Sequence, residues 1–267
     1  MSNVQRVQLQ PAYIIHQRPY RDTSAIVEVF SEAHGRHALV AKGLKRPKSK
    51  LKGLLQPFQP LLVSWVGKSE LGTLTDAELF SRPATIKAQY IPSAFYLNEL
   101  ILHLLLRDDP HDDLFATYHQ TLLNLQQLTG EQVDELRWQA YLRMFELALL
   151  QSIGYGLVLD HDVDSHMPIN AGHNYDYIID HGPVRVNDNT LQRDAVEISG
   201  ATLLMLSDEK RLLAKSQQAD EATKVLFREA KRLLRTIIDF HLGHKTLHSR
   251  VLFANIPSNE PVKAEEV

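Results

Sequence analysis

Apolar and polar residues alternate in short runs through the first third of the chain. The alternation is clearest over residues 26–30, which read Ile, Val, Glu, Val and Phe, as in a half-buried strand. Gly35 closes a short polar connection and allows a positive φ there. Strands are predicted at residues 7–17, 24–31, 36–42, 61–66 and 71–74. Five short strands so close in sequence favour a small β-barrel.

Helical patterns follow the predicted barrel. Helices are predicted over residues 94–107, 114–128, 136–153, 201–215 and 222–242. The segment between the third and fourth helices is irregular, with one predicted hairpin formed by residues 175–179 and 183–186. The fold class is therefore α+β. We expect a barrel over residues 1–83, a mainly helical domain over 84–256 with an irregular or hairpin segment at 154–199, and a flexible tail over 257–267.

Composition excludes several kinds of chemistry. The 267 residues include no cysteine, so disulfides, thiolate zinc sites and thiol nucleophiles are absent. The N-terminal residues lack the apolar core of a signal peptide, and no apolar run reaches the ~20 residues that span a bilayer. No nucleophile elbow, phosphate-binding Gly-rich loop, dinucleotide fingerprint or His-Glu-x-x-His motif is present. We expect a soluble cytoplasmic protein.

Charge divides the chain into two parts. Residues 1–83 hold 12 Lys and Arg against 6 Asp and Glu, whereas residues 84–267 hold 17 against 26. This asymmetry indicates two domains with different partners. The positive part is concentrated in residues 42–52, here called the basic arm, which contain no carboxylate. Its six cations are Lys42, Lys45, Arg46, Lys48, Lys50 and Lys52.

The basic arm has a Gly and a Pro and too few apolar residues to be buried, so it is predicted to be exposed. One interpretation is a solvated loop that only aids solubility. The other is a phosphate-binding arm that projects from a small sheet. Arg18, Arg21 and Arg36 are candidates to extend it. Tyr20 and Trp65 are candidates to stack on bases, although aromatic residues in small barrels more often belong to the core.

A series of short motifs resembles a known family. In the first part they are Arg18-Pro19-Tyr20-Arg21-Asp22-Thr23-Ser24, Phe30, Gly35, Val40-Ala41-Lys42-Gly43, the basic arm and Leu55-Gln56-Pro57-Phe58. In the helical part they are Tyr96-Leu97-Asn98-Glu99-Leu100, Phe145-Glu146-Leu147-Ala148-Leu149-Leu150, Gly154-Tyr155-Gly156 and Ser249-Arg250-Val251-Leu252-Phe253. In this order, over nearly the whole chain, they resemble the RecO family of bacterial recombination mediators.

The resemblance implies an OB-fold at the N-terminus followed by a helical domain. It also implies a non-enzymatic, cofactor-free activity in the cytoplasm and at the nucleoid. Members of such a family bind single- and double-stranded DNA, anneal complementary strands, and work with RecR to load RecA onto DNA coated with single-strand-binding protein. The acidic C-terminal tail of that coat protein is a further partner. Many members carry a four-cysteine zinc site after the motif at residues 154–156, which this chain lacks.

A basic stripe on the last predicted helix is the candidate site for that acidic tail. Lys224, Arg228, Lys231 and Arg235 repeat at intervals of four, three and four residues, opposite an apolar face. The ordinary interpretation is a solvated helix face, and DNA binding is an equal alternative. For the tail, we expect Arg228 to act with Arg143. Such a peptide requires cations for its carboxylates and an adjacent apolar pocket for its terminal side chain. Arg143 also has a simpler explanation, an ion pair with Glu146 three residues later.

Two polar clusters look like metal sites but are interpreted otherwise. The first is His161, Asp162, Asp164, His166, His173 and His181, whose spacing fits no paired-ligand motif, so a metal-free loop is expected. The second is Asp108, Asp109, His111, Asp112 and Asp113, which is better explained as a helix stop and cap.

Two further functions remain open from the sequence. A metal-dependent hydrolase of nucleic acids would use the His- and Asp-rich residues 160–181, and a protein-only scaffold would use the basic arm to meet an acidic partner. The hydrolase predicts bound metal and chelator-sensitive cleavage, whereas the scaffold predicts no DNA binding at moderate salt.

Overall fold

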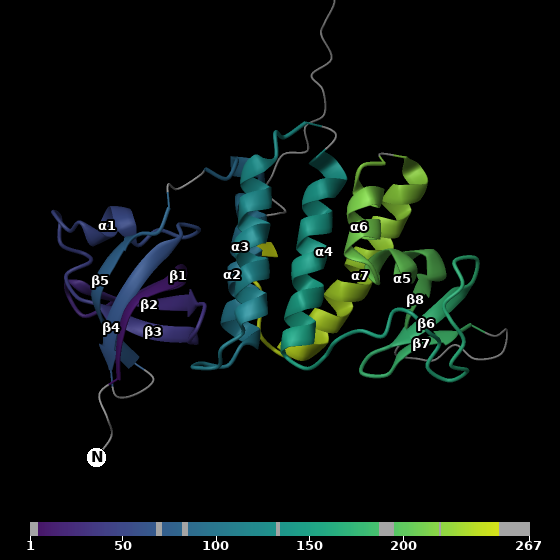
Figure 1. Ribbon diagram of the computed structural model, residues 1–267, viewed down its shortest axis with the longest axis horizontal. Coiled ribbons are helices and arrows are strands. Elements are labelled where there is room, and N and C mark those ends of the chain that lie inside the picture. Colours follow the sequence, from purple (N-terminus) through teal and green to yellow (C-terminus); the bar gives the residue numbers. More distant parts are fainter. Residues whose placement is uncertain are drawn as a thin grey trace, which may run out of the picture.

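The computed structural model describes residues 5–67, 71–81, 85–131, 134–186, 195–218 and 220–250. A β-barrel lies at one end, a row of helices fills the middle, and a small sheet lies at the other end (Figure 1). The predicted tail at 257–267 and the last three residues of the motif at 249–253 lie outside the described residues.

The barrel has the five strands that alternation predicts. They are β1 Gln5–Tyr20, β2 Ser24–Ser31, β3 Gly35–Ala41, β4 Leu61–Gly67 and β5 Leu71–Leu79. The strand order is β1-β2-β3-β5-β4, and β4 pairs back onto β1 to close the barrel. Only β3 and β5 run parallel among the strands of this barrel. This closed, OB-like barrel followed by helices confirms the predicted fold class.

The length of β1 makes the closure possible. Its first half pairs with β4 and its second half with β2, so one strand contributes to both sides of the barrel wall. The pairing register shifts between Val7 and Gln10 and again between Ile14 and His16. Such irregularities bend a strand, as closing a barrel requires.

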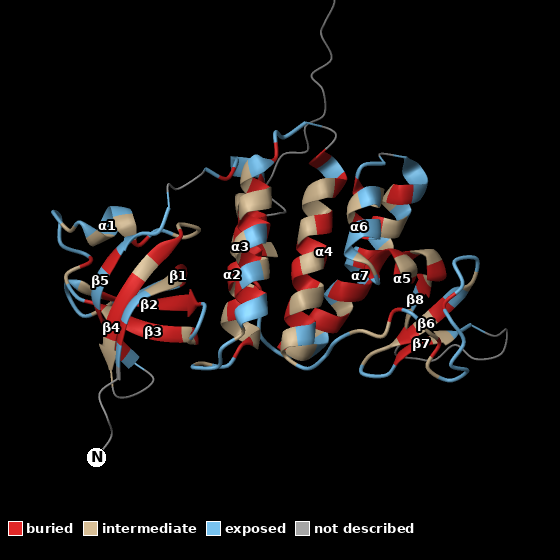
Figure 2. Cartoon of the chain, viewed as in Figure 1, coloured by how far each residue is buried: buried red, intermediate tan, exposed pale blue. Residues whose placement is uncertain are grey.

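Helices account for most of the described residues after β5, and one short helix, α1, lies between β3 and β4. They are α1 Leu51–Leu54, the 3₁₀-helix η1 Ala88–Tyr90, α2 Ile91–Leu104, α3 Asp112–Gln127, α4 Asp134–Ser152, α5 Gly200–Leu206, α6 Glu209–Ser216 and α7 Glu221–Leu242. The apolar face predicted for α7 is the buried one, with Ala230, Leu233 and Ile237 at most 3% exposed. Buried positions line the facing sides of α2, α4 and α7 (Figure 2).

The helix predicted over 201–215 is in fact two helices. The break falls at Asp208, whose backbone is extended and whose side chain accepts hydrogen bonds from the amides of Lys210 and Arg211. This cap starts α6 in a new direction, and its stabilisation is typically about 1 kcal/mol. Apolar periodicity alone does not reveal a break of this kind, because both helices contribute apolar residues to the same core.

The irregular segment contains a three-stranded sheet. The predicted hairpin is β6 Asn174–Ile178 and β7 Gly182–Arg185, and a third strand, β8 Ala195–Ser199, pairs with the other edge of β6. The sequence prediction missed β8. Tyr175, Tyr177 and Ile198 attach the sheet to the core of the helical region.

Aromatic side chains join the barrel to the helices. Tyr13 of β1 and Phe30 of β2 belong to the same buried cluster as the helical core. The ring of Phe30 lies 5.4 Å from that of Phe115, and the ring of Tyr13 lies 5.1 Å from that of Tyr118. The barrel and the helices therefore share one core at this junction.

A buried carboxylate strengthens the same junction. Glu28 of β2 is 4% exposed and pairs with Arg107, which follows α2, and with Arg36 of β3. Arg36 also donates to the backbone carbonyl oxygen of Leu102 in α2. Buried charges of this kind are tolerated only when each has a partner.

Gly35 permits the barrel to approach the helices closely. Its φ is +60°, and a Cβ at this position would lie 1.9 Å from the backbone oxygen of Asp109. Next to it, the amide of Asp108 donates to the carbonyl oxygen of Arg36 (2.9 Å). Only glycine satisfies both the backbone conformation and the contact.

Candidate functional site

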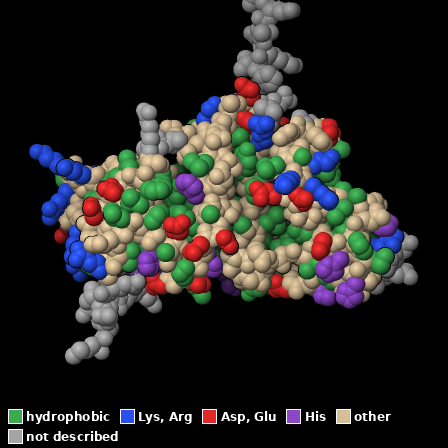
Figure 3. Space-filling view, in the orientation of Figure 1, with side chains coloured by type: hydrophobic (Ala, Val, Ile, Leu, Met, Phe, Trp, Pro, Cys, Tyr) green, Lys and Arg blue, Asp and Glu red, His purple; other side chains and the backbone are tan. Residues whose placement is uncertain are grey.

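The six cations of the basic arm are all exposed and lie at the outer end of the barrel. They follow β3, fold as a series of turns, and end in the single turn of α1. Within the described part of the chain, none of the six forms an ion pair with a carboxylate. Figure 3 shows Lys and Arg side chains gathered over this end of the molecule. Their charge is therefore available to an external anion.

The basic arm is anchored, although its sequence predicts only an exposed loop. Leu44 is 2% exposed and packs into the barrel core, with Leu51 and Leu54 against it. The amide of Lys45 donates to the carbonyl oxygen of Thr23 (2.9 Å), in the turn between β1 and β2. Leu44 and this hydrogen bond thus hold the backbone of the basic arm against the barrel, which lowers the backbone entropy lost when the arm binds a ligand.

Arg18 and Arg21 lie on the same end of the barrel as the basic arm. Both are exposed and flank the connection from β1 to β2 that contains Thr23, the residue that accepts the hydrogen bond from the arm. The guanidinium of Arg21 lies 5.1 Å from the centre of the Tyr20 ring. Tyr20 is half-buried, so part of its ring remains accessible beside these cations.

Two other candidates are placed elsewhere. The side chain of Arg36 is 14% exposed and contacts Glu28 and the backbone oxygen of Leu102 at the junction with the helices, unlike the exposed cations of the basic arm. Trp65 is 3% exposed and lies in the barrel core beside His34 and His37. It has no free face for a base, which agrees with the core interpretation.

A pocket between α2, α4 and α7 collects a second group of cations. We call it the cationic pocket, and its cavity volume is about 160 Å³. Its lining residues are Tyr96, Trp138, Gln139, Leu142, Arg143, Glu146, Lys231, Arg235 and Arg250. Four of these side chains are positively charged and one is a carboxylate, so the lining as a whole favours an anion.

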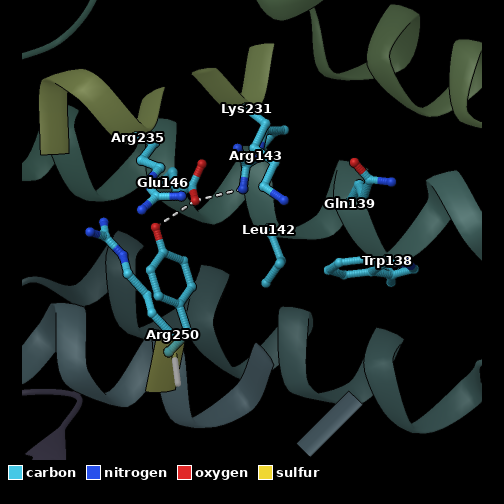
Figure 4. Close-up of a pocket in the computed structure, with 9 residues that line it drawn as sticks. Trp138, Gln139, Leu142, Arg143, Glu146, Lys231, Arg235 and Arg250 are labelled. Atoms are coloured by element: carbon cyan, nitrogen blue, oxygen red, sulfur yellow. Dashed lines mark hydrogen bonds and ion pairs between the residues drawn. The ribbon is translucent and has the colours of Figure 1, made fainter. Parts of the chain in front are cut away.

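Arg143 lies at the centre of the cationic pocket (Figure 4). The predicted ion pair exists, because Arg143 Nη2 donates to Glu146 Oε1 at 2.7 Å, and Tyr96 Oη donates to the same oxygen at 2.8 Å. Arg143 is only 6% exposed, yet its Nε and Nη1 atoms have no hydrogen-bond partner. A buried guanidinium with unused donors is costly, and an anionic ligand would satisfy it.

The opposite side of the pocket carries two apolar side chains next to Gln139. Trp138 is half-buried and Leu142 is buried, and Figure 4 shows both on the side away from Arg235 and Arg250. An apolar cavity of ~150 Å³ holds a benzene-sized ring. The cationic pocket therefore combines a place for one large apolar side chain with donors for neighbouring carboxylates.

Lys231 lies among other positive charges in the cationic pocket. Burial lowers the pKa of Lys231, and the positive charges of Arg143 and Arg235 lower it further. Like charges held together in this way store repulsion that a bound anion relieves. Arg235 and Arg250 are partly balanced by Asp239, which lies beyond the lining and pairs with both of them.

The predicted stripe on α7 divides into two parts. Lys231 and Arg235 line the cationic pocket with Arg143, whereas Lys224 and Arg228 are not part of the lining. Lys224 pairs with Glu221 (3.3 Å) and with Glu135 (4.0 Å). Of the predicted Arg143 and Arg228 combination, only Arg143 lines the cationic pocket, and Arg228 lies on exposed surface.

The clusters that look like metal sites are dispersed. His161 contacts Asp160 and His181 contacts Asp164 (3.3 Å). Asp112 and Asp113 begin α3, where carboxylates interact favourably with the helix dipole. The capping residue of α3 is His111, without a side-chain hydrogen bond. Within the described ranges no three His, Asp or Glu side chains come together as metal ligands.

Asp162 organises the irregular segment that follows α4. It is 4% exposed and accepts hydrogen bonds from the amides of Asp164 (3.0 Å), Ser165 (2.7 Å) and Arg185 (2.7 Å). The last of these connects the loop to β7. One carboxylate thus connects the loop to the strand and fixes both parts of the segment.

We expect Asp162→Asn to lower the free energy of unfolding by about 2 kcal/mol at pH 7, because an amide meets the backbone donors poorly. Burial raises the pKa of Asp162, but the hydrogen bonds from Ser165 and Arg185 outweigh it, and the pKa is lowered. The ionised Asp162 carboxylate therefore stabilises the fold fully at pH values above its pKa in the unfolded chain, about 3.9. This stabilisation is lost as the pH falls through the pKa of Asp162 in the folded state. Urea unfolding from pH 7 to pH 3 measures this.

The control for Asp162→Asn is Asp164→Asn in the same loop, because Asp164 is exposed. Its unfolding free energy is expected to stay close to that of the unaltered chain. A stability difference for Asp162→Asn that stayed constant down to pH 3 would contradict the assigned role of the carboxylate.

Sequence reasoning missed part of the cationic pocket. The sequence pattern predicts no role for Trp138 and Leu142, although they lie four residues apart on one helix, next to Arg143. A partly exposed tryptophan beside a cation is the signal that was available. Arg250 stands out in the sequence only as part of the motif at 249–253, because its place in the lining depends on the path of the chain after α7.

Comparison with known proteins gives a consistent result over both parts of the chain. A family model described as "Recombination protein O N terminal" matches residues 4–82, and one described as "Recombination protein O C terminal" matches residues 90–250. A protein of Nitrosococcus oceani named "DNA repair protein RecO" is 44% identical over 251 residues, which cover 94% of each chain. Proteins of the same name from Nitrosospira multiformis and Dechloromonas aromatica are 42% and 41% identical, over 93% and 94% of this chain and 95% and 97% of their own lengths.

Proposed function

The chain belongs to the RecO family of DNA repair proteins, and from this premise we propose that it is a non-catalytic recombination mediator. It binds single- and double-stranded DNA, anneals complementary strands, and acts with RecR to load RecA onto DNA coated with single-strand-binding protein. Its place of action is the cytoplasm, at the nucleoid. As a separate finding, no helix among the described residues is long and apolar enough to cross a membrane.

The observation that supports this proposal most directly is the unpaired charge of the basic arm. Six exposed cations are held on the barrel by Leu44 and by the hydrogen bond to Thr23. Lysine and arginine neutralise phosphates without reading base sequence. Two strands that repel each other in solution can then approach and pair. Arg18 and Arg21 extend the same surface, with Tyr20 beside them to stack on a base.

The cationic pocket is the proposed receptor for the acidic tail of the coat protein. Arg143, Lys231 and Arg235 supply the donors for its carboxylates. The side of Trp138 and Leu142 accepts an apolar side chain of the same peptide. This arrangement lets the protein hold DNA at the barrel and its coat protein at the helices at the same time.

The proposed function needs charge neutralisation and reversible contact rather than a reactive group. Annealing proceeds by base pairing itself, so the protein has only to lower the repulsion between two backbones. We accordingly propose that it is not an enzyme and requires no cofactor.

Strand annealing measures the proposed function. Two complementary oligonucleotides, each coated with single-strand-binding protein, are labelled as a fluorescence pair and mixed with and without this protein. We expect pairing to be accelerated at least tenfold at 50 mM salt and much less at 300 mM, because bound counterions compete with the basic arm. A coat protein without its acidic tail is expected to abolish most of the acceleration.

The same experiment distinguishes the alternatives. An unchanged rate together with no DNA binding would favour a protein-only scaffold. Cleaved strands, prevented by a chelator, would favour the metal-dependent hydrolase with residues 160–181.

A further inference from the structure

A second pocket lies where the turn between β6 and β7 meets the C-terminal part of α7. One wall is the loop at residues 154–158, which follows α4. The other walls include Asp180 and His181 of the turn and His241 of α7. The cavity volume is about 430 Å³, against about 160 Å³ for the cationic pocket. We call it the His241 pocket, and the mediator function proposed above leaves it without a role.

His241 is a buried polar group with an unsatisfied nitrogen. Its side chain is 7% exposed, and within the described part of the chain its Nε2 atom has no hydrogen-bond partner. Asp180 Oδ1 lies 3.5 Å from Nε2 without satisfying it. Burial lowers the pKa of His241 more than the Asp180 carboxylate raises it, so the ring is neutral at pH 7. With its proton on Nδ1, a neutral imidazole accepts a hydrogen bond at Nε2.

Tyr155 gives the His241 pocket an aromatic face. Its ring stacks on the ring of His241, with the ring centres 3.9 Å apart, while 47% of the residue remains exposed. One face of the Tyr155 ring is thus held by His241, and the other is open to a ligand. Asp180, on the other side of Nε2, is also about half exposed, so a rotation of either side chain uncovers this nitrogen.

The surroundings of the His241 pocket are negative. Residues 154–186 contain five Asp and one Arg, and no described residue of the lining is Lys or Arg. Such a site attracts cations and repels phosphates. A carboxylate, an aromatic face and an acceptor nitrogen together match a guanidinium, which is planar, has five donors and no acceptor, and stacks on aromatic rings.

We propose that the His241 pocket binds the guanidinium of an arginine side chain that a partner protein inserts. The guanidinium plane lies on the ring of Tyr155, one edge pairs with Asp180, and one donor reaches His241 Nε2. The side chain of a protein suits the site better than free arginine, because the lining offers no cation for an α-carboxylate. The site is separate from the basic arm and the cationic pocket, and it adds a basic protein partner to the acidic one.

Fluorine resonances of 3-fluorotyrosine measure the occupancy of the His241 pocket in the full chain. The chain has nine tyrosines, and Tyr155→Phe identifies the resonance of Tyr155. We expect N-acetylarginine amide to shift this resonance with saturation at millimolar concentrations. N-acetyllysine amide should bind at least threefold more weakly, because an ammonium neither stacks as a plane nor pairs along an edge. L-arginine, with its free carboxylate, should also bind at least threefold more weakly.

Asp180→Asn removes the charge of the site and keeps the turn. The φ of Asp180 is +61°, a value that asparagine also adopts. We expect this variant to bind N-acetylarginine amide at least fivefold more weakly. His241→Phe keeps a ring beneath Tyr155 without the acceptor nitrogen and should weaken binding two- to fivefold. The matched control, Asp160→Asn, removes the same charge at an exposed position outside the lining and should bind as the unaltered chain does.

Four results would overturn the inference. The first is a Tyr155 resonance that N-acetylarginine amide does not move. The second is equal affinity for the arginine and lysine amides, or equal weakening by Asp180→Asn and Asp160→Asn, which would indicate a general attraction of cations. The third is L-arginine binding as tightly as the amide, which would assign the pocket to the free amino acid. The fourth is a shift caused by zinc chloride and reversed by a chelator where the arginine amide causes none, which would make the pocket a metal site.

Discussion

Replacing Lys45, Lys48 and Lys50 by glutamine is expected to weaken binding to single-stranded DNA by about 100-fold at 0.1 M salt. Each lysine that neutralises a phosphate contributes ~0.7 to the slope of log affinity against log salt on single strands. Three such contacts correspond to about two powers of ten at 0.1 M. The salt slope itself should fall by about two, which fluorescence titrations at several salt concentrations measure directly.

The salt slope distinguishes contact from general attraction. Lys210→Gln/Arg211→Gln/Lys215→Gln on α6 removes the same charge at the opposite part of the molecule, and none of the three lines the cationic pocket. If the control lowered the affinity and the slope as much as the arm variant, DNA would be bound by the overall field rather than by the basic arm. All three arm lysines are exposed, so the melting temperature should hardly change.

The strands and most helices follow from local patterns, because alternation and helical periodicity are properties of neighbouring residues. The features that the sequence does not predict depend on residues that are far apart in the chain. β8 becomes a strand because β6 offers it a free edge, and its five residues have no distinctive pattern of their own. The break between α5 and α6 likewise depends on one capping carboxylate, Asp208.

The basic residues of the barrel illustrate the same limit. Arg18 and Arg36 look alike in the sequence, as isolated cations near turns. In the structure Arg18 is exposed, whereas Arg36 pairs with Glu28 at the junction with the helices. Which face of a strand meets another domain is not encoded in the strand itself. The basic arm was predictable because six cations without a carboxylate nearby have no neutralising partner in the local sequence.

The cationic pocket was only half predictable for a related reason. The repeat of cations along α7 is visible in the sequence, but the rotation of the helix decides which of them face α4. Lys231 and Arg235 do so, and Arg228 does not line the pocket. Arg143 lies on α4 within the helical core, so its opposition to α7 follows from packing rather than from any motif.

Arg143→Gln is expected to reduce binding of a labelled peptide from the acidic tail of the coat protein by at least 30-fold and to lower the free energy of unfolding by about 3 kcal/mol. The first effect follows because a charge-assisted hydrogen bond in a desolvated site contributes ~2 kcal/mol or more. The second follows because Glu146, which is 1% exposed, would remain buried without its cation. Peptide anisotropy and urea unfolding measure the two effects.

The double variant Arg143→Gln/Glu146→Gln separates recognition from folding. Removing both charges leaves two amides that can bond to each other and to Tyr96, so stability should return to within about 1 kcal/mol of the unaltered chain. Peptide binding should stay weak because the buried guanidinium of Arg143 is absent, although Lys231 and Arg235 remain. If the double variant regained peptide affinity together with stability, Arg143 would serve only to neutralise Glu146, and the acidic ligand would have to be held by the cations of α7 alone.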